Sequence, residues 1–328
     1  MTTLGIIGGG IAGRSLIYAL AKEKKTYTSI ILFDSPEFAH TCSLRSTAVV
    51  ASRGVSEGHS ELGDLLLKSF QTFSAHVSEA APSGIFSITQ YTGALSRLDQ
   101  FRVRYPGGRT DKTFGKLRLK NELYVAEDAA YLIDTQMYLD WLLSAAGGLP
   151  LKAVKEFVTK VEGKIIETVD GSKFEVDQLV FAGGVYNQYW DFKTPSKSVQ
   201  GTYLEFKNVD FGPASFSATL ESDNLIYHAH TKTLLMGSTS QETPHEWPQG
   251  LELRGLYQRL TDLVDLRIPL FESGVIITGL REKAPKRAPY LVSEGSRYRI
   301  GGFYKNGYSL SLHLSQRLAS QLVLEAEE

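Results

Sequence analysis

Cysteine is nearly absent from this chain of 328 residues, in which Cys42 is the only one. A single cysteine excludes an internal disulfide and a metal cluster built from cysteines. An excess of charge of one sign is also missing, since 35 Lys and Arg balance 36 Asp and Glu to a formal net charge of −1. A protein that binds nucleic acid or an anionic membrane would show an excess of positive charge. The composition therefore argues against both classes.

Long apolar runs are missing as well. No stretch approaches the roughly 18 apolar residues that a membrane-spanning helix needs, and residues 1–7 carry no basic segment typical of a secretory signal. Hydrophobic residues nevertheless make up 42% of the chain, and 30 glycines accompany them. The length fits about two domains at roughly 150 residues each, and each is large enough for its own core. We expect a soluble, cytoplasmic, two-domain globular protein.

The start of the chain follows the order strand, glycine turn, helix, strand and acid. The apolar run 4–7 precedes a turn containing Gly8, Gly10, Ile11, Ala12 and Gly13, and the second apolar run 29–33 ends at Asp34. This is the order of a dinucleotide-binding βαβ unit. Gly8 permits the tight turn, Gly10 lets the backbone approach a pyrophosphate, and Gly13 lets the helix pack closely on the sheet. The helix start offers its N–H groups to the phosphates.

Asp34 comes about 20 residues after the glycine turn, where a carboxylate can accept both hydroxyls of an adenosine ribose. The same charge would repel the 2′-phosphate of NADP. An NAD-only dehydrogenase is also disfavoured, because its coenzyme domain is built from a continuous run of βα units. The chain after Asp34 does not continue in that way.

The remaining pattern predicts helices over 61–77, 134–146 and 309–324, and strands at 154–161, 165–169 and 178–181. Strand-rich sequence returns from 198 to 239. Residues 97–121 are strongly basic and irregular, and we expect a solvated surface there. His228 and His230 would share one face of a regular strand. No third ligand is evident, so we expect no metal site.

Four further segments carry a family resemblance. They are Ser-Leu-Arg-Ser-Thr-Ala at 43–48, Asp-Gln-Leu-Val-Phe-Ala-Gly-Gly at 177–184, Gly-Leu-Arg at 279–281 and Gly-Phe-Tyr-Lys-Asn-Gly at 302–307. With the glycine turn and Asp34, and in this order, they resemble the D-amino-acid-oxidase-type (DAO) family of FAD-dependent oxidoreductases, its glycine oxidases in particular. The resemblance spans residues 4 to about 325. It departs after Arg281, where Glu282 stands in place of the family's usual proline.

The resemblance implies an α/β (α+β) fold. It comprises a Rossmann-like FAD-binding domain of the glutathione-reductase/D-amino-acid-oxidase type and a second, mixed-sheet substrate domain. By the same resemblance, residues 1–82, 131–195 and 280–328 form the discontinuous FAD-binding domain. Residues 83–130 and 196–279 then form the substrate domain.

The resemblance also implies where FAD is held. The family's cofactor positions fall on Gly8, Gly10, Ile11, Ala12, Gly13, Asp34, Ser35, Cys42, Ser43, Ser46, Thr47, Ala48, Val158, Ala182, Gly183, Gly302, Tyr304, Lys305, Asn306, Gly307 and Tyr308. Val158 matches the position whose backbone meets the adenine. His40 and Cys42 precede the flavin-side loop, but members that attach flavin covalently use residues placed differently. Noncovalent FAD is therefore expected.

Arg281, Lys305 and Tyr227 are the expected catalytic residues. Amine oxidation by a flavin moves a hydride from the α-carbon to flavin N5, so the substrate must be held over the ring. Arg281 would bind the substrate carboxylate, and Tyr227 would orient the substrate. Lys305 would either add positive charge at the N1–C2 edge of the flavin ring or reach the carboxylate alongside Arg281. Each also has a purely structural interpretation: a surface or interdomain salt bridge for Arg281, an exposed lysine for Lys305 and a packed strand tyrosine for Tyr227.

The expected function is FAD-dependent oxidation of the C–N bond of an amino acid or secondary amine. Two alternatives stay open: an FAD-dependent 2-hydroxy-acid dehydrogenase, since Arg281 would serve any α-carboxylate, and a flavin-binding protein without turnover. The expected partners are a small amine, amino-acid or hydroxy-acid substrate and an electron acceptor, oxygen or a quinone. Nucleic acid and a membrane span are not expected.

Overall fold

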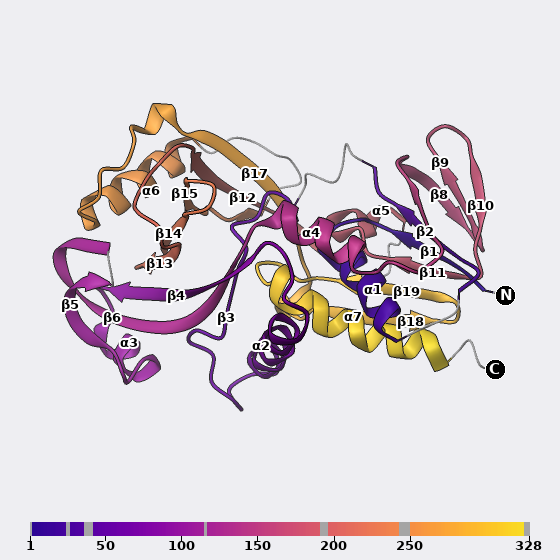
Figure 1. The fold of residues 1–328 in the computed structure, drawn as a ribbon, viewed down its shortest axis with the longest axis horizontal. Helices are drawn as coiled ribbons and strands as arrows, with labels where there is room; N and C mark the ends of the chain where they lie inside the picture. Colours follow the sequence, from indigo (N-terminus) through magenta and orange to yellow (C-terminus); the bar gives the residue numbers. More distant parts are fainter. Residues whose placement is uncertain are drawn as a thin grey trace.

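A computed structural model describes residues 2–23, 27–35, 42–114, 117–190, 196–242 and 250–324. Its strands form three sheets of six, three and ten strands. Figure 1 shows the six-stranded sheet with its helices on the right and the ten-stranded sheet on the left. The strand order and the mixed helix content agree with the expected α/β fold. Within the described ranges, no helix is long and apolar enough to cross a membrane.

The six-stranded sheet contains the glycine turn and both predicted strands of the βαβ unit. Its order is β18-β19-β11-β1-β2-β7, and all neighbours are parallel except β18 and β19. The strands are β1 (Thr3–Ile7), β2 (Ser29–Phe33), β7 (Leu151–Val154), β11 (Gln178–Phe181), β18 (Tyr290–Glu294) and β19 (Arg297–Gly301). The apolar runs predicted for β1 and β2 are buried, as strands covered on both faces must be.

Helices pack against this sheet and against one another. They are α1 (Ile11–Lys22), α2 (Glu61–Ala80), α4 (Thr135–Ser144), α5 (Asn187–Trp190) and α7 (Gly307–Leu324), with the short helix η1 (Gly184–Tyr186). α1 and α7 lie side by side (Figure 1) and share a core in which Leu16, Leu310 and Leu314 are buried. Ser60 and Asp134 cap α2 and α4 by accepting backbone N–H groups, which fixes where these helices begin.

One predicted strand is wrong in its extent. Residues 154–161 are not continuous: β7 ends at Val154 beside β2, and β8 (Val158–Glu162) starts a separate three-stranded sheet with β9 (Ile165–Thr168) and β10 (Lys173–Glu175). The chain leaves one sheet and enters another within three residues. Composition alone does not mark such a change.

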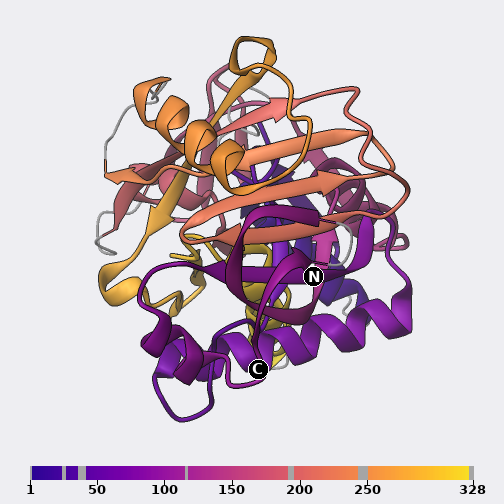
Figure 2. The ribbon, with the colours of Figure 1, turned by 90° about the vertical axis from the view of Figure 1, so that its left-hand side faces the viewer.

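The ten-stranded sheet has the order β16-β12-β15-β14-β13-β4-β6-β3, with β17 beside β12 and β5 beside β6. Its strands are β3 (Val49–Ala51), β4 (Ile85–Ala94), β5 (Arg109–Phe114), β6 (Leu117–Ile133), β12 (Lys197–Phe206), β13 (Phe216–Leu220), β14 (Asp223–His228), β15 (Thr233–Gly237), β16 (Gln241–Glu242) and β17 (Val275–Lys283). Figure 2 looks at the molecule from this end. Helix α6 (Gly250–Leu263) packs on one face of the sheet and forms an apolar core with it.

The basic segment 97–121 is more regular than its sequence predicts. It contains helix α3 (Leu98–Arg104), strand β5 and the start of β6, and Arg109 forms ion pairs with Asp111 and Glu127. The short helices η2 (Phe271–Ser273) and η3 (Pro285–Arg287) complete the described elements. The two large sheets follow the predicted division of the chain except at three strands: β3 joins the ten-stranded sheet, β6 runs past residue 130, and β17 crosses residue 280. The division into domains stays a prediction.

Candidate functional site

The glycine turn between β1 and α1 depends on the absence of side chains. Gly8 has a φ of 112°, and a Cβ there would lie 2.6 Å from the carbonyl oxygen of Ala182 on the neighbouring loop. A Cβ on Gly13 would collide with the carbonyl oxygen of Gly8, because the helix lies directly on the turn. Ile11 N–H donates to Ser43 Oγ at 3.0 Å. The turn is therefore held against the loop at 42–48.

A first cavity of about 140 Å³ runs past this turn. Much of its wall is backbone, because glycines from four separate segments line it. The predicted residues that line it are Gly8, Gly10, Ile11, Ala12, Asp34, Ser35, Cys42, Ser43, Val158, Ala182, Gly183, Gly302, Tyr304 and Gly307. Gly13 does not line it and instead serves the close packing of α1. The carbonyl of Val158 accepts a hydrogen bond from Trp190 Nε1 at 2.9 Å. Trp190 also lines the cavity, and the sequence patterns do not predict it.

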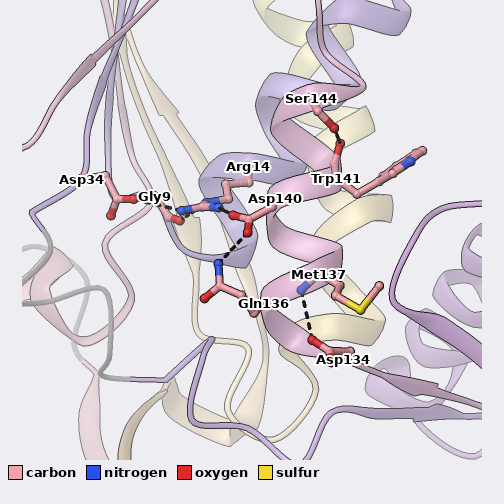
Figure 3. Close-up of polar contacts among 9 residues, drawn as sticks. All are labelled: Gly9, Arg14, Asp34, Asp134, Gln136, Met137, Asp140, Trp141 and Ser144. Atoms are coloured by element: carbon pink, nitrogen blue, oxygen red, sulfur yellow. Dashed lines mark hydrogen bonds and ion pairs between the residues drawn. The ribbon is translucent and has the colours of Figure 1, made fainter. Parts of the chain in front are cut away.

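Asp34 is held at the cavity by an arginine that the sequence reasoning missed. Arg14 Nη2 lies 3.3 Å from Asp34 Oδ2, while Arg14 Nε donates to the carbonyl of Gly9 at 2.7 Å (Figure 3). Arg14 Nη1 also pairs with the exposed Asp140 at 3.1 Å. Arg14 thus orients one carboxylate oxygen of Asp34. The Oδ1 atom has no partner within the described ranges, so it can accept a ligand hydroxyl.

A second, larger cavity of about 330 Å³ adjoins the first. Ile11, Cys42, Ser43, Tyr304 and Gly307 line both cavities. The predicted residues found only in the second are Ser46, Thr47, Ala48, Arg281, Lys305, Asn306 and Tyr308. The start of α7 faces this cavity through Gly307, Tyr308 and Ser309, and the first turn of a helix presents N–H groups and a positive dipole end. The structure therefore brings nearly all predicted residues to one continuous site.

Arg281 lies on β17 with its guanidinium at the second cavity. Its Nη2 donates to Ser238 Oγ at 3.0 Å and its Nη1 to the carbonyl of Thr239 at 3.5 Å. A Cβ on Gly201 of the neighbouring strand β12 would collide with the guanidinium, so the glycine makes room for it. No acidic side chain pairs with Arg281 in the described part of the chain. The structural interpretation of Arg281 as an interdomain ion pair is therefore not supported.

Lys305 follows the positive-φ residue Tyr304 and lines the second cavity beside Arg281. Burial lowers the pKa of Lys305, the charge of Tyr304 raises it, and the charges of Arg281 and Arg287 lower it further. Lys305 is nevertheless exposed to solvent, in agreement with its alternative interpretation as an exposed lysine, while it also borders the cavity. It lies close to other positive charges.

Glu282 is the residue that departs from the family pattern, and it is buried at 5% exposure. Its carboxyl accepts hydrogen bonds from Tyr290 Oη at 2.6 Å, the Gly302 N–H at 2.8 Å and Ser196 Oγ at 3.1 Å. Burial raises the pKa of Glu282, although these hydrogen bonds oppose the shift. Glu282 therefore ties the end of β17 to the loop that starts at Gly302.

Tyr227 is the one predicted catalytic residue that the structure places away from the site. It is fully buried, packs against Phe211 and Phe216, and donates to the carbonyl of Gly212 at 3.3 Å. The reason is the alternation of side chains along β14. Its neighbour Ile226 faces the second cavity, so Tyr227 faces the core under α6. The proposed role of Tyr227 in orienting a substrate is a wrong prediction.

The remaining candidates are Cys42, His40, His228 and His230. The Cys42 thiol lines both cavities, and burial raises its pKa; His40 lies outside the described residues. His228 is buried, and its pKa falls to about 4 because of burial first and the neighbouring His230 second. His230 instead pairs with Asp134 at 3.2 Å. Within the described ranges, no group of three or more His, Cys, Asp or Glu could hold a metal ion.

FAD fits these cavities. The backbone-walled first cavity passes the start of α1, where phosphates bind well. A Cβ at Gly8 would collide with the backbone of Ala182 and Gly183, and the polar acceptor Asp34 lines the same cavity beside Gly9. The adjoining second cavity is wide and bordered by the start of α7. The residues present thus match an elongated dinucleotide whose far end is a broad ring.

Comparisons with known proteins agree with this geometry. A comparison with curated protein sequences finds no match. Among solved structures, glycine oxidase from Geobacillus kaustophilus superposes with a TM-score of 0.76 at 18% identity, covering 98% of this chain and 95% of that one. Iminodiacetate oxidase from Chelativorans sp. BNC1 superposes with a TM-score of 0.77 at 16% identity, covering 98% of this chain and 95% of that one. L-proline dehydrogenase from P. horikoshii gives 0.77 at 13% identity, covering 98% and 93%.

At such identities the superpositions show a shared fold. The family model for FAD-dependent oxidoreductases (DAO) matches residues 4–321, nearly the whole chain. With the glycine turn, the paired cavities and this match in place, the chain belongs to the DAO family of FAD-dependent oxidoreductases.

Proposed function

We propose that this oxidoreductase acts on the C–N bond of an amino acid or secondary amine that carries a carboxylate. The observation that carries the proposal is the guanidinium of Arg281, which faces the second cavity without an acidic partner among the described residues. Such a group binds a carboxylate in bidentate fashion. A carboxylate fixed there places the adjacent α-carbon inside the cavity.

The residues of the two cavities would divide the cofactor between them. Asp34 would accept ribose hydroxyls, the turn at Gly8 and Gly10 would face the pyrophosphate, and Val158 would meet the adenine. The loop 43–48 and residues 302–308 would surround the flavin ring. When bound, FAD supplies the acceptor for the hydride that leaves the α-carbon. Because burial raises the pKa of the Cys42 thiol, little thiolate is available there, and we expect noncovalent FAD that acid precipitation releases.

The chain's own groups would position the substrate and favour negative charge. Arg281 would orient the carboxylate, and its contact with Ser238 keeps the guanidinium in place. Lys305 and the start of α7 add positive potential at the same cavity. Oriented binding of this kind converts a two-body reaction into a unimolecular one. The names of the similar structures, a glycine oxidase, an iminodiacetate oxidase and an L-proline dehydrogenase, support this choice of substrate class.

The test is anaerobic mixing of the purified holoenzyme with amino acids, N-substituted glycines and 2-hydroxy acids. We expect amino or imino acids to bleach the flavin absorbance and to release ammonia or an amine on hydrolysis. Arg281→Gln should lower kcat/KM by a factor of about 30 to 5,000, equivalent to about 2–5 kcal/mol for removal of one partner of a buried charge pair, with FAD retained. Arg317→Gln, on the exposed face of α7, is the matched control.

Two other results would redirect the assignment. Bleaching by hydroxy acids without release of ammonia or amine would establish oxidation of a C–OH bond instead. Bound flavin that no carboxylate substrate reduces would indicate a flavin-binding protein without turnover.

A further inference from the structure

We propose that the substrate carries two anionic groups, one bound by Arg281 and the other by Arg53, so that the preferred substrate is a dicarboxylic amino or imino acid. This inference rests on the proposed function and adds the substrate class to it. It starts from the charges at the second cavity. The cationic side chains that line it are Arg45, Arg53, Arg281 and Lys305, and no Asp or Glu is among the described lining residues.

Arg53 follows β3 and reaches the cavity from the opposite side to Arg281. Its Nη1 donates to Thr219 Oγ1 at 2.6 Å, which fixes the guanidinium against β13. Burial lowers the pKa of Arg53, while Tyr105 and the charge of Asp128 act in the opposite direction. Asp128 forms no ion pair with Arg53 among the described residues and does not line the cavity. Among the described residues, the hydrogen bonds of this half-buried guanidinium go to the hydroxyls of Thr219 and Tyr105 and not to a carboxylate, so the group can bind an anion.

The sheet face beside Arg53 is polar, although it is buried. Along β13, Ala218 and Leu220 face the core under α6, while Ser217 and Thr219 face the cavity. Gln90 on β4 and Asn224 on β14 are their neighbours on the same face. Burying polar side chains costs more free energy than burying apolar ones, so this polar face indicates that a polar molecule occupies the cavity.

These side chains form a short hydrogen-bonded chain around one hydroxyl. Gln90 Nε2 donates to Thr219 Oγ1 at 3.4 Å, and Thr219 Oγ1 donates to Asn224 Oδ1 at 2.5 Å. The Oγ1 atom of Thr92, next to Thr219 in the register of β4 and β13, is buried with no partner. The amides of Gln90 and Asn224 keep N–H groups that a carboxylate can accept from. Arg53 thus lies in a prepared polar pocket.

The two arginines are anchored at positions that a short molecule can bridge. Arg281 contacts Ser238 at the end of β15, and Arg53 contacts Thr219 on β13. The strand between them is β14, where Asn224 pairs with both Gly237 and Thr219. At about 4.8 Å between neighbouring strands, the two anchors lie about 10 Å apart. A short chain with a carboxylate at each end matches this spacing of the two anchoring residues, and a monocarboxylate bound at Arg281 leaves Arg53 without an anion.

Binding of carboxylates is tested on the FAD-loaded protein with compounds that the enzyme does not oxidise. Malonate, succinate and glutarate are titrated against propionate, butyrate and pentanoate, and the shift of the bound flavin's visible spectrum gives each Kd. We expect at least one dicarboxylate to bind ten times more tightly than the monocarboxylate of equal length. Arg53→Gln should remove that preference and change monocarboxylate binding less than twofold. Arg281→Gln should weaken both series.

Two further variants keep the test decisive. Arg102→Gln removes a positive charge from the exposed face of α3, which does not line the cavity and is not among the charges that act on Arg53, and it should leave every Kd unchanged. Arg53→Lys keeps the charge but loses the bidentate fork, so it should retain part of the preference. Flavin content and thermal melting show whether each variant is folded. If Arg53→Gln does not fold, the wild-type series and Arg53→Lys decide.

The outcomes separate this inference from the proposed function. Equal binding of dicarboxylates and monocarboxylates by the wild-type protein overturns the second anion site, even if neutral amino acids reduce the flavin. A dicarboxylate preference that Arg53→Gln leaves intact overturns it as well. Conversely, an Arg53-dependent preference together with no reduction by any amino or imino acid, aspartate, glutamate and iminodiacetate included, supports the anion site and contradicts C–N oxidation.

Discussion

The carboxyl of Glu282 accepts a hydrogen bond from the backbone N–H of Gly302 at 2.8 Å, joining the end of β17 to the loop before α7. Gly302 has a φ of 71°, and a Cβ there would lie 2.8 Å from Ala284 Cβ. The loop is thus held in a backbone conformation that favours glycine. Because Arg281 precedes Glu282 and Lys305 follows the loop, one buried acid fixes both cationic groups relative to each other.

Glu282→Ala should therefore weaken both the fold and FAD retention. It would leave the Gly302 N–H, Tyr290 hydroxyl and Ser196 hydroxyl without their acceptor, at about 1–3 kcal/mol for each buried group left unsatisfied. We expect the free energy of unfolding to fall by at least about 2 kcal/mol and FAD to dissociate faster. Urea denaturation and flavin-release measurements check this. Glu175→Ala, at an exposed position on β10, is the control, and identical behaviour of the two variants would contradict the role of Glu282.

Asp34→Ala should raise the Kd for FAD, because the carboxylate would no longer accept ribose hydroxyls. Charge-assisted hydrogen bonds contribute about 1.5–3 kcal/mol, a factor of about 10 to 150 in Kd. Equilibrium titration of the apoprotein with FAD measures the change. Asp140→Asn is the matched control, since Asp140 pairs with the same Arg14 but is exposed and does not line the cavity. An equal loss of affinity in both variants would assign the effect to Arg14 and not to a ribose contact.

The positive charge of Lys305 should make carboxylate binding depend on pH. Burial lowers its pKa, Tyr304 opposes the shift, and Arg281 and Arg287 add to it. Lys305 therefore loses its proton at a lower pH than an ordinary lysine, and affinity for carboxylates should decline as pH rises through that lowered pKa. The Kd of acetate is measured against pH by flavin perturbation. Lys305→Arg should remove the decline, because arginine stays protonated; an unchanged profile would exclude Lys305 as its source.

The local features of the site were predictable from the sequence, and the long-range ones were not. The βαβ unit was predicted because its strand, turn, helix and acid are contiguous, and Asp34 follows directly from that order. Arg281 and Lys305 were found because short family motifs contain them. The roles of Arg53 and Glu282 were not predicted, because their partners are distant in the sequence. Only the folded chain brings Thr219 to Arg53 and Gly302 to Glu282.

Tyr227 shows a second limit of prediction from the sequence, the face of a strand on which a side chain lies. The sequence correctly predicts a strand there, but a strand has two faces, and a one-residue shift in parity exchanges them. The leucines of α6 decide the parity, because Leu253, Leu256 and Leu260 cover the face to which Tyr227 belongs. No pattern within 225–230 identifies which face α6 covers. The same parity directs Ile226 and Asn224 to the cavity.

His76 should make the protein less stable in mild acid. It lies on α2 at 6% exposure, with Nε2 3.2 Å from the Tyr138 hydroxyl, and its pKa falls to about 4 because of burial first and the charge of Lys22 second. Between its unfolded pKa of about 6.5 and pH 4, the unfolded chain binds a proton that the folded protein does not. The contribution of neutral His76 to the free energy of unfolding is therefore fully present above pH 6.5. It decreases by about 3 kcal/mol as the pH falls towards 4.

His76→Gln removes the titrating group while keeping a side chain that can bond to Tyr138. We expect the free energy of unfolding of this variant, measured by urea denaturation from pH 4 to 7.5, to depend less on pH than that of the wild type. His228, whose pKa also falls to about 4, keeps part of the dependence. His59→Gln, at an exposed position before α2, should reproduce the wild-type curve. If His76→Gln and His59→Gln gave the same slope, the buried imidazole would not be the source of the acid sensitivity.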